Sequence, residues 1–139
     1  MQSNPQNITF AIIKPEAVKK NLIGKITTII EKNQFEICGI TMIQMTLEKA
    51  KLFYKMHEDR PFYNDLCTYM CSGKIVAMVL KKTNAVENFR KLIGTTNPKD
   101  AAKNTIRYQF GTSIEENAIH GSDSDDNANR EKAFFFKKS

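Results

Sequence analysis

The feature that most constrains the fold of this chain is an uninterrupted apolar run from Ile75 to Leu80. A strand with one face in water alternates apolar and polar residues, whereas a strand covered on both faces is apolar throughout. The preceding pair Ser72-Gly73 is typical of the end of a helix, so the run is short and bounded. It therefore predicts a fully covered strand.

Along the rest of the chain, the hydrophobic spacing switches between the strand period and the helix period. Strands are expected at residues 8–14, where Ile8, Phe10 and Ile12 alternate with the period of a half-buried strand before Pro15, then from Phe35 to about Thr46, and from Ala118 to His120. Helices are expected from Leu22 to Asn33, from a Thr46 cap to about Tyr54, after Pro61, from an Asn84 cap to Gly94, and from a Ser122 or Asp123 cap to before Phe134. The segment from Thr95 to about Asn104 is expected to be a loop.

This order of elements favours an α+β fold. Strand, helix, strand, helices, strand, helix, strand and helix suit a ferredoxin-like βαββαβ sandwich, with a mostly antiparallel sheet covered by helices. At 139 residues and 41% hydrophobic, the chain can bury one core but is too short for two ordinary domains. We expect a single domain over residues 1–139.

The charge, the hydropathy and the cysteines restrict the class of ligand and the cellular compartment. A formal charge of +6, scattered along the chain, suits a polyanionic ligand such as a nucleotide, a nucleic acid or an acidic surface, without choosing among them. No apolar run approaches the roughly 20 residues of a membrane span, and Met1 to Gln6 lacks the pattern of a signal peptide. The three cysteines do not make a disulfide framework. We expect a soluble, cytoplasmic protein with no membrane partner.

His120 is the candidate nucleophile. It ends a short apolar strand and precedes Gly121, which predicts a sharp bend that exposes the ring. A neutral imidazole is a good nucleophile near pH 7, especially when a carboxylate orients its other nitrogen. The alternative is a surface histidine in a turn. The other histidine, His57, stands beside Glu58 and Asp59 and is interpreted as a surface residue.

Several residues at the ends of elements could stabilise a phosphoryl group, which needs cations and hydrogen-bond donors around it during transfer. These are Lys14, Arg90, Thr96, Arg107 and Asn117. Taken singly, each is also explained as solvated charge or turn chemistry. Phe62 could stack on a nucleobase or belong to the core. Because the chain has neither a P-loop nor a G-x-G-x-x-G motif, a nucleotide site would have to be built another way.

Taken together, these segments resemble the nucleoside diphosphate kinases from about Thr9 to Phe136. The motifs are Ile-Lys-Pro-Glu at 13–16, Asp-Arg-Pro-Phe-Tyr at 59–63, Gly-Thr-Thr-Asn-Pro at 94–98, Thr-Ile-Arg at 105–107 and Asn-Ala-Ile-His-Gly-Ser-Asp-Ser at 117–124. The resemblance implies a ping-pong transfer of the γ-phosphate from a nucleoside triphosphate to a nucleoside diphosphate through a phosphohistidine at His120.

The resemblance also implies a role for each site residue. Lys14, Arg90, Thr96, Arg107 and Asn117 would hold the phosphates and the sugar, and Phe62 would pack on the base. Tyr54 and Ser122 would lie near the histidine, and Glu131 would orient its ring. Mg²⁺ would come with the nucleotide phosphates, so no protein metal ligand is expected. The family is usually hexameric, less often tetrameric, and stacking alone implies broad base specificity.

The chain departs from the usual family pattern at a few positions. Glu16 replaces a commoner aspartate, and Phe53 stands where a histidine often precedes the tyrosine. Around Thr-Ile-Arg, Asn104, Tyr108 and Gln109 replace a common Gly before and Gly-Asp after. These changes bear on loop geometry, subunit contacts and turnover more than on the type of reaction.

Two other functions compete with this hypothesis. A small basic module could bind single-stranded nucleic acid on its sheet, which would need aromatic residues interleaved with Lys or Arg on an exposed face. The strands carry mainly Ile, Val and Met, so nucleic acid is an unlikely partner. An enzymatically silent scaffold of the same fold is the other alternative.

Overall fold

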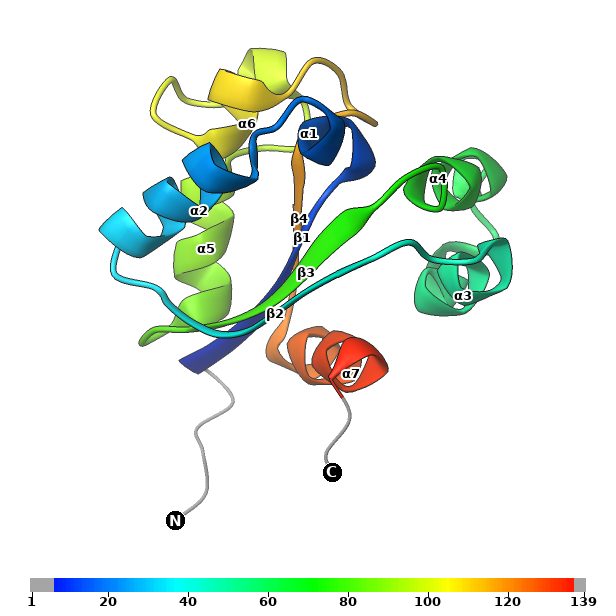
Figure 1. Ribbon diagram of the computed structural model, residues 1–139, viewed down its shortest axis with the longest axis horizontal. Helices are drawn as coiled ribbons and strands as arrows, with labels where there is room; N and C mark the ends of the chain where they lie inside the picture. The colour runs from blue at the N-terminus through cyan, green and yellow to red at the C-terminus, as the bar shows by residue number, and fades with distance from the viewer. Residues whose placement is uncertain (1–6, 137–139) are drawn as a thin grey trace.

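The computed structural model describes residues 7–136, so the segment Met1 to Gln6 lies outside the described residues. In the described part of the chain, a four-stranded sheet has the order β2-β3-β1-β4 (Figure 1). The strands are β1 (Ile8–Ile13), β2 (Glu36–Ile43), β3 (Ile75–Lys81) and β4 (Ile119–Gly121). All neighbouring strands run antiparallel. This order and these directions confirm the predicted ferredoxin-like α+β fold.

Helices cover both faces of the sheet (Figure 1). One face packs against α2 (Ile23–Lys32) and α5 (Ala85–Ile93), with the short helices α1 (Pro15–Lys19) and α6 (Ile106–Phe110) beside them. The other face packs against α3 (Leu47–Phe53), α4 (Tyr63–Met70) and α7 (Asp125–Phe135). Two 3₁₀ turns, Lys55–His57 and Pro98–Asp100, complete the connections. Within residues 7–136, no helix has the length and apolar character needed to cross a membrane.

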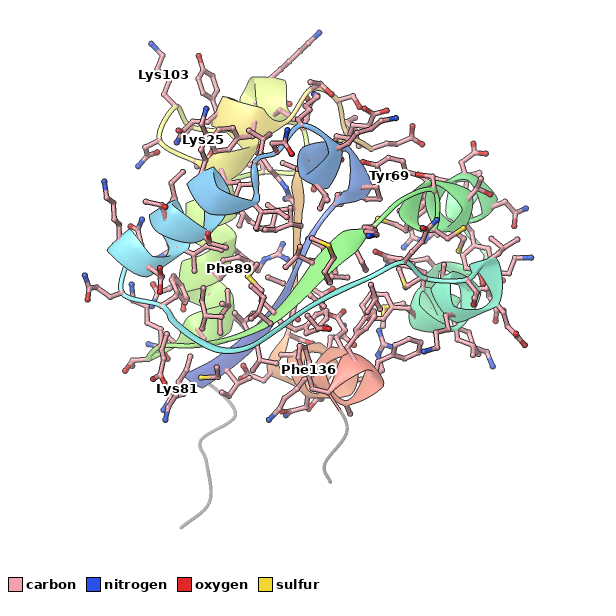
Figure 2. All side chains as sticks on the ribbon, in the orientation of Figure 1. Lys25, Tyr69, Lys81, Phe89, Lys103 and Phe136 are labelled. Carbon is pink, nitrogen blue, oxygen red and sulfur yellow. The ribbon has the colours of Figure 1, made fainter. Side chains whose placement is uncertain are left out.

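The apolar run from Ile75 to Leu80 forms most of the covered strand β3. Its even-numbered residues from Val76 to Leu80 belong to the core under α2 and α5, and its odd-numbered residues from Ile75 to Val79 belong to the core under α3, α4 and α7. Side chains fill both sides of the sheet (Figure 2). Among the described residues, β1 and β3 are covered on both sides, and the exposed positions of β2 carry Ile40 and Met42 rather than aromatic residues on which bases could stack. This arrangement argues against the single-stranded nucleic-acid module.

Strand β2 is shorter than predicted. Its odd-numbered residues are the less exposed ones, as expected, but the strand ends at Ile43 instead of Thr46. A register shift between Ile37 and Gly39 also puts Ile37 against the core under α2 and α5 and Ile43 against the other core. Ile43 pairs with Ile75, which is the first residue of β3, so the ladder has no further partner. Met45 then turns into the core under α3 and α4, where it is 3% exposed.

The prediction that Asn84 caps a helix is wrong in its mechanism. Thr46 caps α3 as predicted, because its hydroxyl accepts a hydrogen bond from the Lys49 N–H. Asn84 does precede α5, but its backbone is left-handed with φ 52° and its side chain makes no capping hydrogen bond. Asn84 therefore turns the chain into α5, since asparagine tolerates this conformation better than most residues.

The predicted bounds of the last helix are also wrong. Ser124, not Ser122 or Asp123, caps α7 by accepting a hydrogen bond from the Asn127 N–H. The Ser122 hydroxyl is instead buried against Glu131, to which it donates a hydrogen bond. The helix continues to Phe135 rather than stopping before Phe134. Phe135 stacks on Phe10 of β1 with ring centroids 5.4 Å apart, so its packing holds the last turn against the sheet.

Candidate active site

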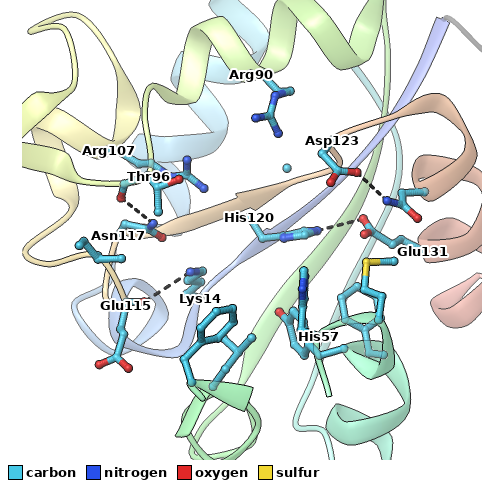
Figure 3. Close-up of a pocket in the computed structure, with 18 of the residues that line it drawn as sticks. Lys14, His57, Arg90, Thr96, Arg107, Glu115, Asn117, His120, Asp123 and Glu131 are labelled. Atoms are coloured by element: carbon cyan, nitrogen blue, oxygen red, sulfur yellow. Dashed lines mark hydrogen bonds and ion pairs between the residues drawn. The ribbon is translucent and has the colours of Figure 1, made fainter. Parts of the chain in front are cut away.

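The predicted site residues surround one cleft of about 810 Å³ (Figure 3). All of them except Ser122 line it: Lys14, Tyr54, Phe62, Arg90, Thr96, Arg107, Asn117, His120 and Glu131. Ser122 is 1% exposed and does not line the cleft, but its hydroxyl donates a hydrogen bond to Glu131, which does. The fold therefore gathers residues that are as much as 117 positions apart, from Lys14 to Glu131.

The ring of His120 is held by aromatic neighbours. His120 lies in β4 opposite Ile12 of β1, on the sheet face that carries Phe10. The rings of Phe10, Phe53 and Tyr54 meet the imidazole edge to face, with centroid distances of 6.4, 5.9 and 6.4 Å. The side chain of His120 is 20% exposed, toward the cleft. These contacts fix the plane of the ring and leave part of it accessible.

The bend predicted at Gly121 lies elsewhere. Gly121 is part of β4, and a Cβ on it would lie 3.0 Å from side-chain atoms of Phe89 and Ile93 on α5. The glycine is therefore needed for the close approach of α5. The sharp turn is at Ala118, whose φ of 78° is unusual for a residue with a side chain. The chain turns before His120, not after it.

Glu131 reaches back from α7 to the histidine. Its Oε1 lies 2.9 Å from His120 Nε2 and 2.7 Å from the Ser122 hydroxyl, which donates to it. A carboxylate oxygen accepts hydrogen bonds, so this contact places the proton of a neutral imidazole on Nε2. The lone pair of the ring is then on Nδ1. With Glu131 only 4% exposed, the pair is shielded from competing water.

Arg107 is built into the wall of the cleft beside β4. Its Nη1 donates to the Gly94 carbonyl at 3.0 Å and its Nη2 to the Ile119 carbonyl at 2.8 Å. Its buried Nε has no hydrogen-bond partner among the described residues. Burial, followed by repulsion from Arg90, lowers the pKa of Arg107 to about 10. The two carbonyls orient the guanidinium in advance, and no carboxylate of residues 7–136 forms an ion pair with it.

Lys14 is a second cation of the cleft, and its surroundings disfavour its charged form. It follows β1, is 7% exposed, and its Nζ lies 3.4 Å from the Glu115 carbonyl oxygen. Burial first and repulsion from Arg107 second lower the pKa of Lys14 to about 8. Glu16 and Glu115 offset only part of this effect, so a polyanionic ligand would add the negative charge that keeps Lys14 protonated.

Asn117 and Thr96 meet at the back of the cleft. The Asn117 side-chain N–H donates to the Thr96 carbonyl at 2.9 Å. Asn117 is 1% exposed, and its Oδ1 has no partner among the described residues. A buried acceptor of this kind is rare in a folded protein and is satisfied when a ligand hydroxyl or amine reaches it.

The mouth of the cleft is apolar and exposed. Phe62 is 42% exposed, and the ring of His57 lies 5.9 Å from it in a tilted arrangement. Ile114, 56% exposed, also lines the cleft, together with Met56. The surface interpretation of His57 is thus incomplete, because the cleft includes it. Ile114 was not singled out from the sequence, where an isoleucine in a polar loop gives no chemical signal.

The departures from the family pattern lie mostly outside the cleft. Asn104, Tyr108 and Gln109 are exposed, and none of them lines it. Phe53 is different, since it is 1% exposed, packs on His120, and has the Arg130 guanidinium 5.6 Å from the centre of its ring. Within residues 7–136, no group of three or more His, Cys, Asp or Glu side chains is arranged to hold a metal ion.

Comparison with known proteins gives a consistent result. The family model described as "Nucleoside diphosphate kinase" matches residues 7–139. The chain is 52% identical over 128 residues to the nucleoside diphosphate kinase of Lawsonia intracellularis, covering 92% of this chain and 93% of that one.

Solved structures agree in fold. The nucleoside diphosphate kinase of Aquifex aeolicus superposes with a TM-score of 0.93 at 41% identity, over 94% of this chain and 95% of that one. A halophilic nucleoside diphosphate kinase from Halobacterium salinarum in complex with CDP gives a TM-score of 0.90 at 38% identity, over 94% and 88%.

Proposed function

This chain belongs to the nucleoside diphosphate kinase family, and we propose on that premise that it transfers the γ-phosphate of a nucleoside triphosphate to a nucleoside diphosphate through a phosphohistidine at His120. The observation that carries the proposal is the contact of 2.9 Å between His120 Nε2 and Glu131 in a cleft that also contains Lys14, Arg90 and Arg107. An oriented nucleophile facing fixed cations is what phosphoryl transfer requires.

The reaction follows from the tautomer that Glu131 selects. The lone pair on Nδ1 attacks the γ-phosphorus, and the bond from that phosphorus to the bridging oxygen breaks. The nucleoside diphosphate leaves with that electron pair. In the second half, a terminal oxygen of another nucleoside diphosphate attacks the phosphorus, and the P–N bond breaks to restore the lone pair on Nδ1. Glu131 stabilises the positive ring that exists while the phosphoryl group is attached.

The rest of the cleft would bind the nucleotide. Lys14, Arg90 and Arg107 face the phosphates, the free Oδ1 of Asn117 is available to a sugar hydroxyl, and the base packs between Phe62 and Ile114. Apolar contact with the base discriminates weakly, so broad base specificity is expected. Bound Mg²⁺ would neutralise part of the phosphate charge, held by phosphate oxygens because the cleft offers cations rather than a carboxylate cluster.

The direct test is to incubate the protein with γ-labelled ATP and Mg²⁺. We expect an acid-labile, alkali-stable phosphoprotein that loses its label when an unlabelled nucleoside diphosphate is added. A silent scaffold would take up no label. A label stable in acid would indicate a phosphoester on serine or threonine and would contradict the proposal.

Glu131→Gln should slow phosphohistidine formation by roughly 10- to 100-fold, by analogy with the loss of a carboxylate that orients a metal-bound histidine. The amide still accepts a hydrogen bond but no longer stabilises a positive ring. ADP affinity should change little, because Glu131 does not face the phosphates. Single-turnover phosphorylation and equilibrium ADP binding measure the two effects separately. The matched control is Glu115→Gln, which alters an exposed carboxylate of the same cleft. A loss of ADP binding with an unchanged phosphorylation rate would contradict the orienting role.

Nucleotide capture should weaken as the pH rises through about 8. The pKa of Lys14 is about 8 in the folded protein instead of its ordinary 10.5, so the free protein loses this cation as the pH rises through that value. The pH profile of kcat/KM reports the ionisation of groups in the free enzyme. We expect kcat/KM to fall by roughly 10-fold or more on the alkaline side. In Lys14→Arg the cation persists, so the fall should move to higher pH. An alkaline limb at the same pH in both proteins would exclude Lys14 as its origin.

We also propose that the chain forms a homo-oligomer, with a hexamer favoured over a tetramer. Strand β2 is an edge strand whose exposed residues Ile40 and Met42 are 53% and 47% accessible. An apolar open edge of this kind favours pairing with another chain. The mass in solution distinguishes six copies from four.

We place this single-domain enzyme, residues 1–139, in the cytoplasm, where its nucleotide substrates occur.

A further inference from the structure

The backbone at Ala118 is strained, two residues before His120. Its φ is 78°, and the N–H of Ile119 donates to the carbonyl of Asn117 at 3.0 Å across it. A hydrogen bond that spans one residue with positive φ defines the rare form of the γ-turn. Such turns persist only where the surroundings hold them. The question is therefore what holds Ala118.

Both backbone polar groups of Ala118 are bound by the segment after β1. Its carbonyl accepts from the Lys14 backbone N–H at 2.9 Å, and its N–H donates to Glu16 Oε2 at 2.8 Å. Any residue at position 14 other than proline supplies the first bond. Only a side chain with an acceptor at this reach supplies the second, so the identity of Glu16 matters for the turn.

Glu16 is itself held from the other side. It is 9% exposed, and its Oε1 accepts a hydrogen bond from the Tyr69 hydroxyl of α4. Burial, followed by the hydrogen bond to Glu16, raises the pKa of Tyr69, so the hydroxyl stays protonated as a donor. The carboxylate thus links α1, α4 and the turn, and each of its oxygens has a defined partner.

We propose that Glu16 is a positioning residue for phosphoryl transfer: its carboxylate holds Ala118 in the strained turn and so sets Asn117 and His120 relative to each other. This inference rests on the proposed function. Asn117 comes just before the turn and presents its unpartnered Oδ1, while Ile119 and His120 come just after it and pair with β1. A relaxed Ala118 would rotate one group against the other and misalign the nucleotide with Nδ1.

The first test compares Glu16→Ala with the double variant Glu16→Ala/Ala118→Gly. Glu16→Ala should slow phosphohistidine formation by roughly 10- to 100-fold, by analogy with the loss of a residue that orients a metal ligand. Glycine adopts positive φ without steric cost, so the double variant should regain most of the rate. Ala118→Gly alone is the control and should stay within a few-fold of wild type. Glu16 also opposes the loss of the proton from Lys14. If that charge were its role, glycine at 118 would restore nothing, and the proposal would be overturned.

The second test is Glu16→Gln, which keeps an acceptor oxygen for the Ala118 N–H and removes the charge. A rate within a few-fold of wild type is expected, with ADP affinity and melting temperature measured alongside. A rate as low as that of Glu16→Ala would overturn the proposal. The γ-labelled ATP experiment on the wild-type protein separates the two levels of inference. If the wild type forms no phosphohistidine, the proposed function fails; if it does and Glu16→Ala is equally fast, only the role of Glu16 fails.

Discussion

Replacing His120 with alanine should abolish phosphoryl transfer while the protein stays folded. The nucleophile has no substitute, so activity should drop on the order of 10⁴-fold or more. The fold should tolerate the change, because the His120 side chain is partly exposed and its strand is held by backbone pairing with β1. Steady-state transfer from ATP to a nucleoside diphosphate measures the loss, and circular dichroism with a melting curve checks the fold.

The matched control for this prediction is His57→Ala. The chain has two histidines, and both line the same cleft. If the label from γ-labelled ATP resides on His120, His57→Ala should keep its phosphohistidine and His120→Ala should lose it. Any loss of nucleotide affinity in His57→Ala should appear as a higher KM, since the His57 ring contacts Phe62 at the mouth of the cleft. If the label were retained in His120→Ala and lost in His57→Ala, the nucleophile would be His57 and the assignment to His120 would be wrong.

The fold was largely predictable because its strongest signals are local. The apolar run at 75–80 specifies a strand covered on both sides. The alternation of Ile8, Phe10 and Ile12 correctly indicated a strand beside it, but β1 is buried on both faces and not half-buried, because Ala11 and Ile13 pack into the core under α2 and α5. The element ends were less predictable, because tertiary contacts decide them. β2 stops where β3 ceases to offer partners, and α7 runs on because Phe135 stacks on Phe10.

The sequence motifs indicated which residues would gather in the site, but not what supports them. Three features needed the structure: the aromatic rings around His120, the carbonyls that orient Arg107, and the strained turn at Ala118. Each depends on segments far apart in the chain, so no local pattern announces it. At Gly121 the local pattern was misleading. A glycine after a histidine suggested a bend, but the glycine is required by the close packing of α5.

Arg107→Ala should be the most damaging loss among the residues proposed to clamp the phosphates. Its guanidinium is oriented by the Gly94 and Ile119 carbonyls, so it needs no reorganisation when charge builds on the transferring phosphoryl group. Removing one such donor typically costs about 2.7–4 kcal/mol of transition-state stabilisation, or 10²- to 10³-fold in rate. We expect kcat/KM for the nucleotide to fall by that factor.

The same substitution also removes two structural hydrogen bonds, so stability must be separated from catalysis. Leaving two carbonyls without a donor should lower the free energy of unfolding by about 1–3 kcal/mol, which urea denaturation measures. Arg90→Ala supplies the comparison, because Arg90 points into the cleft from α5 (Figure 3) and we expect its loss to affect kcat/KM more than stability. Arg107→Lys keeps a charge but cannot bond both carbonyls and a phosphate in the same geometry, so it should fall between wild type and Arg107→Ala. If Arg90→Ala and Arg107→Lys both kept the wild-type kcat/KM while Arg107→Ala lost only stability, the cations of this cleft would be structural and the phosphate clamp would be refuted.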